Sequence, residues 1–236
     1  MKRYLKKLPY SYTFGIYPTI ELLKKRGDKV KAIYLHSNLE GNESSQTIRK
    51  LALRHRVKIE VNNKLIKKLS SKENSYVIGV FEKYLSPMLH GKDNHIVLVE
   101  PRNPGNMGTI LRSMLAFNFS NLAVITPAVD IFHPTVIRAS MGSVFSINFS
   151  FFENIDQYIK KFKFHNLYCF LLDTKNYLKK TKFKRPYSLV FGNEGHGLPE
   201  KFKKLGTSVK IAQSNNVDSL NLAISTGIGM NWLYKR

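Results

Sequence analysis

A glycine- and asparagine-rich segment after the apolar stretch Ile96–Val99 holds residues that could do chemistry. Gly105 and Gly108 allow the backbone to turn sharply and to approach a ligand closely. Asn106 offers both a donor and an acceptor, and Arg112 follows inside the expected helix. A strand, a glycine turn and a helix start together form a potential anion site. Neither a dinucleotide fingerprint nor a Gly-Lys-Ser/Thr phosphate loop is present, so the segment alone is a weak signature of a nucleotide site. The alternative interpretation is a tight turn followed by a surface arginine.

A second segment, Leu189–Glu200, has three glycines within six residues. We expect a loop of positive φ angles whose exposed amide and carbonyl groups bind an adenine or ribose edge. Glu194 is the only acid between Asp173 and Glu200. It is a candidate to bind a ribose hydroxyl or a cationic group, and its structural interpretation, which is compatible with such binding, is to anchor the loop by accepting backbone N–H groups. His196 is interpreted as a loop residue, since no second His, Cys or acid is recognised at the spacing of a ligand set.

A third polar segment, Val209–Ser225, leads into an apolar helix that is expected to end near Tyr234. Asp218 or Ser219 is predicted to cap this helix, although Ser219 could equally face a ligand. Asn221 falls one or two residues inside the expected helix, where an amide side chain lowers helix propensity. We therefore predict an outward-facing contact for Asn221.

Apolar strands without polar alternation must position these three segments. Such strands, alternating with helices, are typical of a parallel sheet that is covered on both faces. Ligands then bind beyond the carboxyl ends of the strands, where the polar segments follow. Cys169 lies inside one strand and is interpreted as a buried core residue. The predicted strands are Ile96–Val99, Leu122–Ile125, Leu167–Leu172 and Leu189–Phe191.

The N-terminal part of the chain predicts a separate, smaller α/β unit. A boundary is expected where Ser86-Pro87 and His90–Asn94 interrupt the periodicity. We therefore divide the chain into residues 1–88 and residues 89–236. The predicted elements of the first part are helices at Tyr17–Lys25 and Ser45–Arg54 and strands at Val30–Leu35, Val57–Val61 and Tyr76–Phe81.

The formal net charge of +22 indicates a polyanionic partner. Residues 1–90 hold 19 Lys and Arg against 7 Asp and Glu, and residues 91–236 hold 19 against 9, so the excess is not confined to a tail. A lysine-rich composition bias is the alternative explanation. The single cysteine excludes an internal disulfide. With no apolar run near 20 residues and no signal-like N-terminus, we expect a cytoplasmic protein that does not cross a membrane.

The three segments together resemble the SpoU or TrmH-like branch of the SPOUT RNA methyltransferases. The shared pattern is Asn106-x-Gly108-x-x-x-Arg112, then Gly192-x-Glu194-Gly195-x-Gly197, then Ser219-Leu220-Asn221, in the family's order and spacing. The intervening Arg138–Ser143 is similar to the family's linking segment. The chain departs from the family pattern at Ile211-Ala212-Gln213, where the family often has Ile-Pro-Met. A proline in the middle position would fix φ and stiffen the loop that is implied to bind the cofactor.

This resemblance implies an α/β fold in two parts. The first is a small ribosomal-protein-like domain that binds the RNA substrate, with Tyr76–Val80 as its best-matching piece. The second is a parallel-sheet SPOUT domain with a C-terminal trefoil knot, a rare feature that periodicity does not predict. A homodimer with the active site near the subunit interface is expected. The expected product is a ribose 2′-O-methyl group, in ribosomal RNA in preference to transfer RNA.

The resemblance also assigns site residues. S-adenosylmethionine is the implied cofactor, and no metal is expected. The implied cofactor-binding residues are Gly192, Glu194, Gly195, Ile211, Ser219 and Leu220, and the implied catalytic residues are Asn106, Arg112, Glu194, Ser219 and Asn221.

The chemistry of arginine restricts the part that Arg112 can play. An arginine with a pKa above about 12 is a poor base, so we expect Arg112 to bind the target phosphate and to stabilise alkoxide charge. Asn106, Ser219 and Asn221 would orient the reactants, and Glu194 would shape the cofactor loop. Two rival functions are a non-catalytic RNA-binding protein of the same fold and a nicotinamide-dependent oxidoreductase. The second lacks the dinucleotide fingerprint.

Overall fold

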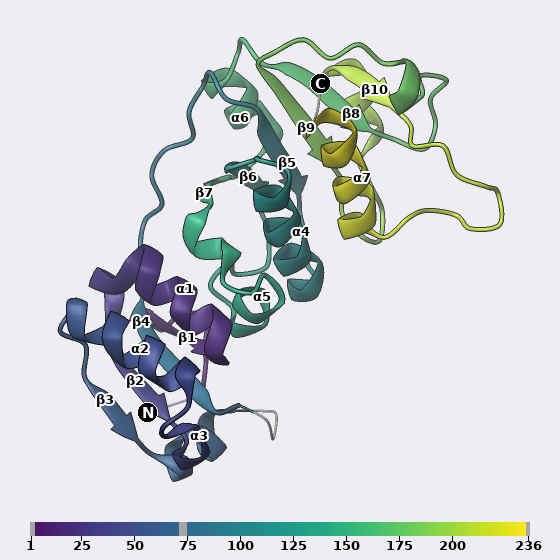
Figure 1. The fold of residues 1–236 in the computed structure, drawn as a ribbon. Helices are drawn as coiled ribbons and strands as arrows, with labels where there is room; N and C mark the ends of the chain where they lie inside the picture. The colour runs from purple at the N-terminus through teal and green to yellow at the C-terminus, as the bar shows by residue number, and fades with distance from the viewer. Residues whose placement is uncertain (1–2, 71–74, 235–236) are drawn as a thin grey trace. The chain divides into compact units, whose positions relative to one another are not determined.

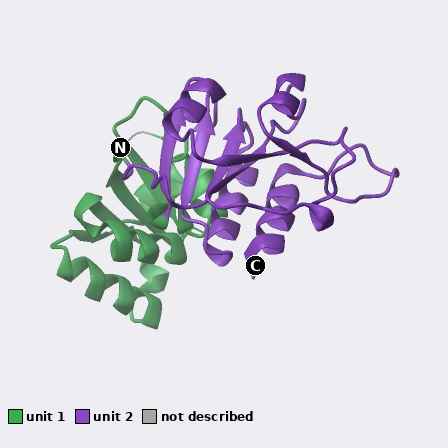
Figure 2. Ribbon diagram, turned by 90° about the horizontal axis from the view of Figure 1, so that it is seen from above, with its two compact units in different colours: residues 1–85, 130–146 green, residues 86–129, 147–236 purple. Residues whose placement is uncertain are grey.

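The computed structural model describes residues 3–70 and 75–234. The chain divides into two compact units, which Figure 2 colours separately. Unit 1 comprises residues 1–85 and 130–146, and unit 2 comprises residues 86–129 and 147–236.

Unit 1 is built on a four-stranded sheet of order β1-β4-β2-β3, in which β2 and β3 are parallel and the other pairs antiparallel. Gly79 in β4 lets the first helix approach the sheet, since a Cβ there would lie 3.2 Å from Leu22 and 3.3 Å from Thr19, both in that helix. The third helix packs Ile66 and Leu69 against Tyr12 and its neighbours. The elements are β1 (Tyr10–Phe14), α1 (Ile16–Arg26), η1 (Gly27–Lys29), β2 (Val30–Leu35), η2 (Ser37–Leu39), α2 (Glu43–Arg54), β3 (Ile59–Val61), α3 (Asn63–Leu69) and β4 (Val77–Glu82) (Figure 1).

A segment from the middle of the chain completes unit 1. It contains α5 (Pro134–Ala139) and η3 (Ser143–Ser146). Phe132 packs edge-on against Phe81 of β4 at 5.8 Å, and Lys83 Nζ lies 2.8 Å from Asp130 Oδ2. The predicted division at residue 88 had placed this segment, including the Arg138–Ser143 motif, in the second part. Its contacts join it to the first, and no local pattern in the sequence announces such long-range packing.

Unit 2 contains a six-stranded, all-parallel sheet of order β10-β8-β9-β5-β6-β7, which confirms the predicted α/β class and parallel sheet. The strand order reverses beside β5, the arrangement that opens a crevice at the carboxyl ends of the strands. The elements are β5 (His95–Val99), α4 (Pro104–Ala116), β6 (Asn121–Ile125), β7 (Asn148–Phe152), α6 (Ile155–Lys161), β8 (Asn166–Phe170), η4 (Leu178–Lys180), β9 (Tyr187–Phe191), η5 (Glu200–Lys204), β10 (Thr207–Val209) and α7 (Leu222–Tyr234).

Both faces of this sheet are covered by helices. Helices α4 and α7 lie side by side on one face (Figure 1). The core on the other face includes Tyr158 and Phe162 around α6 and Phe202 of η5. Cys169 is buried in that core, which confirms the prediction of a buried strand cysteine, and burial raises the pKa of its thiol to about 12.

Two buried histidines meet at the amino ends of the central strands. His95 and His165 have ring centroids 4.4 Å apart, and neither is exposed. His95 Nδ1 lies 2.8 Å from the Tyr158 hydroxyl, and His165 Nδ1 lies 2.9 Å from Ser188 Oγ. Burial lowers the pKa of His95 to about 4 and lowers that of His165 as well. Both rings are therefore neutral in the folded protein near pH 7.

This pair predicts a loss of stability in mild acid. The unfolded imidazole has a pKa near 6.5, so below that pH the unfolded state binds protons that folded His95 does not. The contribution of neutral His95 to the free energy of unfolding is fully present above pH 6.5. It decreases by on the order of 3 kcal/mol as the pH falls towards 4. Urea denaturation at a series of pH values should give a flatter dependence for His95→Gln than for the wild type. An equal slope in the two proteins would contradict the assignment.

Candidate active site

A pocket of about 320 Å³ opens in unit 2 beyond the ends of β8, β9 and β10. Phe170 and Phe191 stack with centroids 4.2 Å apart and form an aromatic wall. Gly229 of α7 permits this stack to lie under the helix, because a Cβ there would be 3.1 Å from both rings. The six residues implied as cofactor-binding all line the pocket: Gly192, Glu194, Gly195, Ile211, Ser219 and Leu220.

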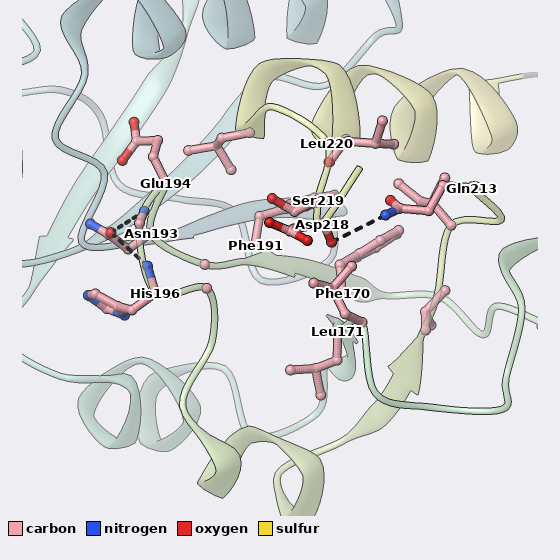
Figure 3. A pocket seen from close by; sticks show the side chains of 18 residues that line it. Phe170, Leu171, Phe191, Asn193, Glu194, His196, Gln213, Asp218, Ser219 and Leu220 are labelled. Carbon is pink, nitrogen blue, oxygen red and sulfur yellow. Dashed lines mark hydrogen bonds between the residues drawn. The ribbon is translucent and has the colours of Figure 1, made fainter. Parts of the chain in front are cut away.

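Polar and apolar groups occupy different parts of the pocket. In Figure 3, Glu194, Asn193 and His196 lie at one end and Gln213 at the other, with Ser219 between them. The stacked phenylalanines, Ile211 and Leu220 supply apolar surface. Such a cavity suits a ligand that has a flat ring and a polar, charged portion.

The carboxylate of Glu194 joins the second segment to the first. Its Oε2 accepts the backbone N–H of Arg102 at 3.1 Å, and its Oε1 accepts that of Asn103 at 3.0 Å and Asn106 Nδ2 at 3.2 Å. Burial raises the pKa of Glu194, but these hydrogen bonds outweigh it, and the net pKa lies below the usual range. Of the two interpretations from the sequence, the anchoring one agrees with this geometry. An ionised carboxylate with its oxygens engaged in this way is unsuited to act as a base.

Asn221 joins the third segment to the first. Its Nδ2 donates to Asn106 Oδ1 at 3.1 Å, while its Oδ1 accepts the N–H of Ala223 at 2.8 Å. Asn221 therefore precedes α7 and caps it. The predicted cap at Asp218 or Ser219 was wrong, because α7 begins at Leu222, later than expected. One amide thus stabilises the helix start and orients Asn106.

The glycine loop has a different backbone from the one predicted. Of its three glycines, Gly197 alone has a positive φ, at 67°. The turn is instead held by Asn193, whose Oδ1 accepts the N–H of Gly195 at 2.8 Å and whose Nδ2 donates to Glu100 O at 2.7 Å. Gly192 is required by close packing, since a Cβ there would lie 2.2 Å from the Gly197 carbonyl carbon.

Where the chain departs from the family pattern, at Ala212-Gln213, the glutamine side chain forms hydrogen bonds within its own loop. Gln213 Nε2 lies 3.4 Å from the carbonyl oxygens of both Val217 and Asp218 and donates to them. The amide therefore closes the pocket-lining loop through hydrogen bonds (Figure 3). Ala212 itself is exposed.

Arg112 is not brought to the pocket of its own chain. It lies exposed on α4 and is not among the residues that line the cavity. Successive residues of a helix are turned by about 100°, so a separation of six positions points Arg112 well away from Asn106. Within the described residues, the guanidinium has no hydrogen bond or ion pair. Its cationic head is free to meet an anion.

Four residues in and around the site escaped the sequence analysis. Asn193 shapes the glycine loop, and Phe170 and Phe191 form the aromatic wall. Asn103 caps α4 by accepting the N–H groups of Gly105 at 2.8 Å and Asn106 at 3.1 Å. The Asn103-Pro104 pair carries the recognisable signal of a cap followed by proline in the first turn. The aromatic stack has no local signal, because its rings come from two strands.

Residues 93–231 match the model of the SpoU rRNA Methylase family, and the chain belongs to this family. The solved AdoMet-bound rRNA methyltransferase of Sinorhizobium meliloti is similar over 96% of this chain and 87% of that one, with 26% identity and a TM-score of 0.82.

Curated relatives give shorter matches. An uncharacterized tRNA/rRNA methyltransferase of Synechocystis sp. is 29% identical over 136 residues, which are 56% of this chain and 50% of that protein. The 23S rRNA (uridine(2479)-2′-O)-methyltransferase of Streptomyces viridochromogenes is 38% identical over 52 residues, 22% of this chain and 18% of that one. The chain thus spans half the length or less of these two relatives.

In the described part of the chain, no helix is both long and apolar enough to cross a bilayer. Among residues 3–70 and 75–234, no cluster of three or more His, Cys, Asp and Glu side chains could hold a metal ion.

Proposed function

We propose that this protein uses S-adenosylmethionine to methylate a ribose 2′-hydroxyl in ribosomal RNA. The observation that carries the proposal is the pocket at the carboxyl ends of β8, β9 and β10, where the six implied cofactor residues meet and Glu194 and Asn221 connect to Asn106. The names of the relatives support an RNA substrate, and one of them specifies 2′-O-methylation of ribosomal RNA.

The apolar and polar groups that line the pocket fit S-adenosylmethionine. The stacked Phe170 and Phe191, with Leu220, offer apolar surface for an adenine ring. Gly195 and Ser219 offer polar groups beside them for a ribose or amino-acid portion. When bound, this cofactor supplies an electrophilic methyl group, so the protein's part is to hold and orient the two partners.

The polar network positions the acceptor. Asn106 is held from one side by Glu194 and from the other by Asn221, which keeps its amide in one orientation. In our proposal Asn106, Ser219 and Asn221 orient the ribose, and Glu194 keeps the glycine loop in place. Arg112 binds the phosphate of the target nucleotide and stabilises the negative charge that develops on the 2′-oxygen. The proton leaves through that phosphate or through water.

The proposed assembly is a homodimer with the active site near the subunit interface. The exposed position of Arg112, outside the pocket of its own chain, supports this assembly. Dimerisation would bring the guanidinium to the ribose. We also propose that the loops after β9 and β10 form the trefoil knot of the family; both line the pocket. Unit 1 is proposed to bind the RNA substrate.

Analysis of the methylated product tests the proposal. RNA modified by the purified protein is digested to nucleosides, and the methylated species are separated by mass spectrometry. We expect a 2′-O-methylnucleoside from ribosomal RNA. A base-methylated nucleoside would contradict the ribose assignment, and methylation of transfer RNA alone would contradict the ribosomal one.

A further inference from the structure

The loop between β8 and β9 carries an unusual concentration of positive charge. Residues 175–185 hold six of the 19 Lys and Arg residues found in residues 91–236, and they include no acid. Five of these, which we name the lysine ridge, are exposed: Lys175, Lys179, Lys180, Lys182 and Lys184. In the described part of the chain, none of the five forms an ion pair. A general lysine bias does not explain why they gather in one loop.

The backbone of this loop is held in place by its uncharged residues. Leu178 is buried, and the Phe183 ring lies 4.3 Å from the ring of Tyr168. The Tyr168 hydroxyl accepts the N–H of Lys184 at 2.8 Å and donates to the carbonyl of Lys182 at 3.1 Å. The apolar side chains therefore face the protein, and the lysines remain outside. A fixed backbone lowers the entropy lost when the lysines bind a ligand.

The ridge begins beside the cofactor pocket. Leu178 N donates to Lys210 O at 2.8 Å, and Lys210 N donates to Asn176 O at the same distance. Lys210 stands between Val209 and Ile211, which both line the pocket. Figure 1 shows this green loop near the edge strand β10.

The acid nearest in the sequence does not cancel the charge of the ridge. Asp173 precedes the loop, and its carboxylate lies 2.6 Å from Lys203 Nζ. Lys203 also lies 2.8 Å from Glu200, so one lysine outside the ridge engages both local acids. The five ridge lysines are left to face an external polyanion.

We propose that the lysine ridge binds the phosphate backbone of the RNA substrate and guides the strand to the pocket. This inference rests on the proposed function for the identity of the polyanion. Lysines spaced along a fixed loop next to the pocket match a chain of phosphates that continues beyond the reacting nucleotide. Such contacts give affinity without base selection.

A charge-matched pair of variants tests the ridge. The first combines Lys179→Gln, Lys180→Gln and Lys182→Gln. The control combines Lys160→Gln, Lys161→Gln and Lys163→Gln, which removes three exposed lysines from the region of α6 in the same unit. Equilibrium binding is measured by fluorescence anisotropy with a short labelled oligouridine and with purified ribosomal RNA, without cofactor.

The ridge variant should bind RNA about tenfold more weakly than the wild type. The slope of the logarithm of its binding constant against the logarithm of the salt concentration should decrease in magnitude by about 2 between about 50 and 200 mM salt. The control should stay within about twofold of the wild type. Equal binding and equal slopes in the two variants would overturn the inference.

Titration with S-adenosylmethionine separates the two proposals and should give the same affinity for the wild type and the ridge variant. A wild type that binds RNA through the ridge but neither binds the cofactor nor transfers a methyl group would support the ridge and overturn the proposed function.

Discussion

Replacing Arg112 with alanine is expected to reduce methyl incorporation into RNA by about 10²–10³-fold, the usual cost of removing one group that stabilises developing oxyanion charge. The guanidinium is exposed on α4 and does not line the proposed cofactor pocket. Its removal should therefore leave the affinity for S-adenosylmethionine within about twofold, which isothermal titration measures. Incorporation of labelled methyl groups at saturating cofactor gives the rate.

A conservative variant shows what Arg112 contributes. Arg112→Lys keeps the positive charge but loses the planar fork that binds a phosphate through two hydrogen bonds. We expect a rate between those of the alanine variant and the wild type. Wild-type turnover in Arg112→Ala would refute the assignment, and so would a loss of cofactor binding in a folded Arg112→Ala protein.

Substituting Gly192 should reduce cofactor binding by an equally large factor. The structure shows a different cause for this loss from the one that the family resemblance implies. The family resemblance implies that Gly192 binds the cofactor, so a side chain there would be expected to meet the cofactor. In the structure, a Cβ would already lie 2.2 Å from the Gly197 carbonyl carbon and 2.4 Å from Leu198 N. The clash is with the chain's own backbone, so alanine should suffice to displace the loop that lines the pocket.

Gly192→Ala is therefore expected to weaken binding of S-adenosylmethionine by about 100-fold or more and to lower the free energy of unfolding without cofactor by about 1–3 kcal/mol. Gly227→Ala is the matched control, since a Cβ there has nothing within 4 Å. It should retain both stability and binding. Denaturation of the cofactor-free proteins decides the cause: an unchanged stability in Gly192→Ala would mean that the clash lies elsewhere.

The elements with strong local signals were predicted well. The apolar stretches at Ile96–Val99 and Leu122–Ile125 correspond to β5 and β6, and the expected helix at Tyr17–Lys25 corresponds to α1. The prediction missed β1 and β7, which have mixed polar and aromatic residues and are defined mainly by pairing with distant strands. Pairing with a distant segment leaves no periodic pattern in the local sequence, so these strands could not be recognised from it.

The order of the three motifs predicted which residues would meet, but not how each would act. Asn221 was expected to make an outward contact, and it does contact Asn106, yet the same amide also caps α7. The identity of a capping residue depends on where the helix begins, which sequence patterns locate to within a few residues at best. Likewise, two interpretations of Glu194 were open until its hydrogen bonds to the N–H groups of Arg102 and Asn103 favoured the anchor.

Transfer of a labelled methyl group from S-adenosylmethionine to RNA tests the central claim most directly. The substrate is ribosomal RNA from cells that lack this protein, and the enzyme is the purified full chain, with Arg112→Ala as the inactive reference. We expect label in RNA with the wild type, recovered as a 2′-O-methylnucleoside, and almost none with Arg112→Ala. Binding of both RNA and cofactor without any transfer of label by the wild type would contradict it.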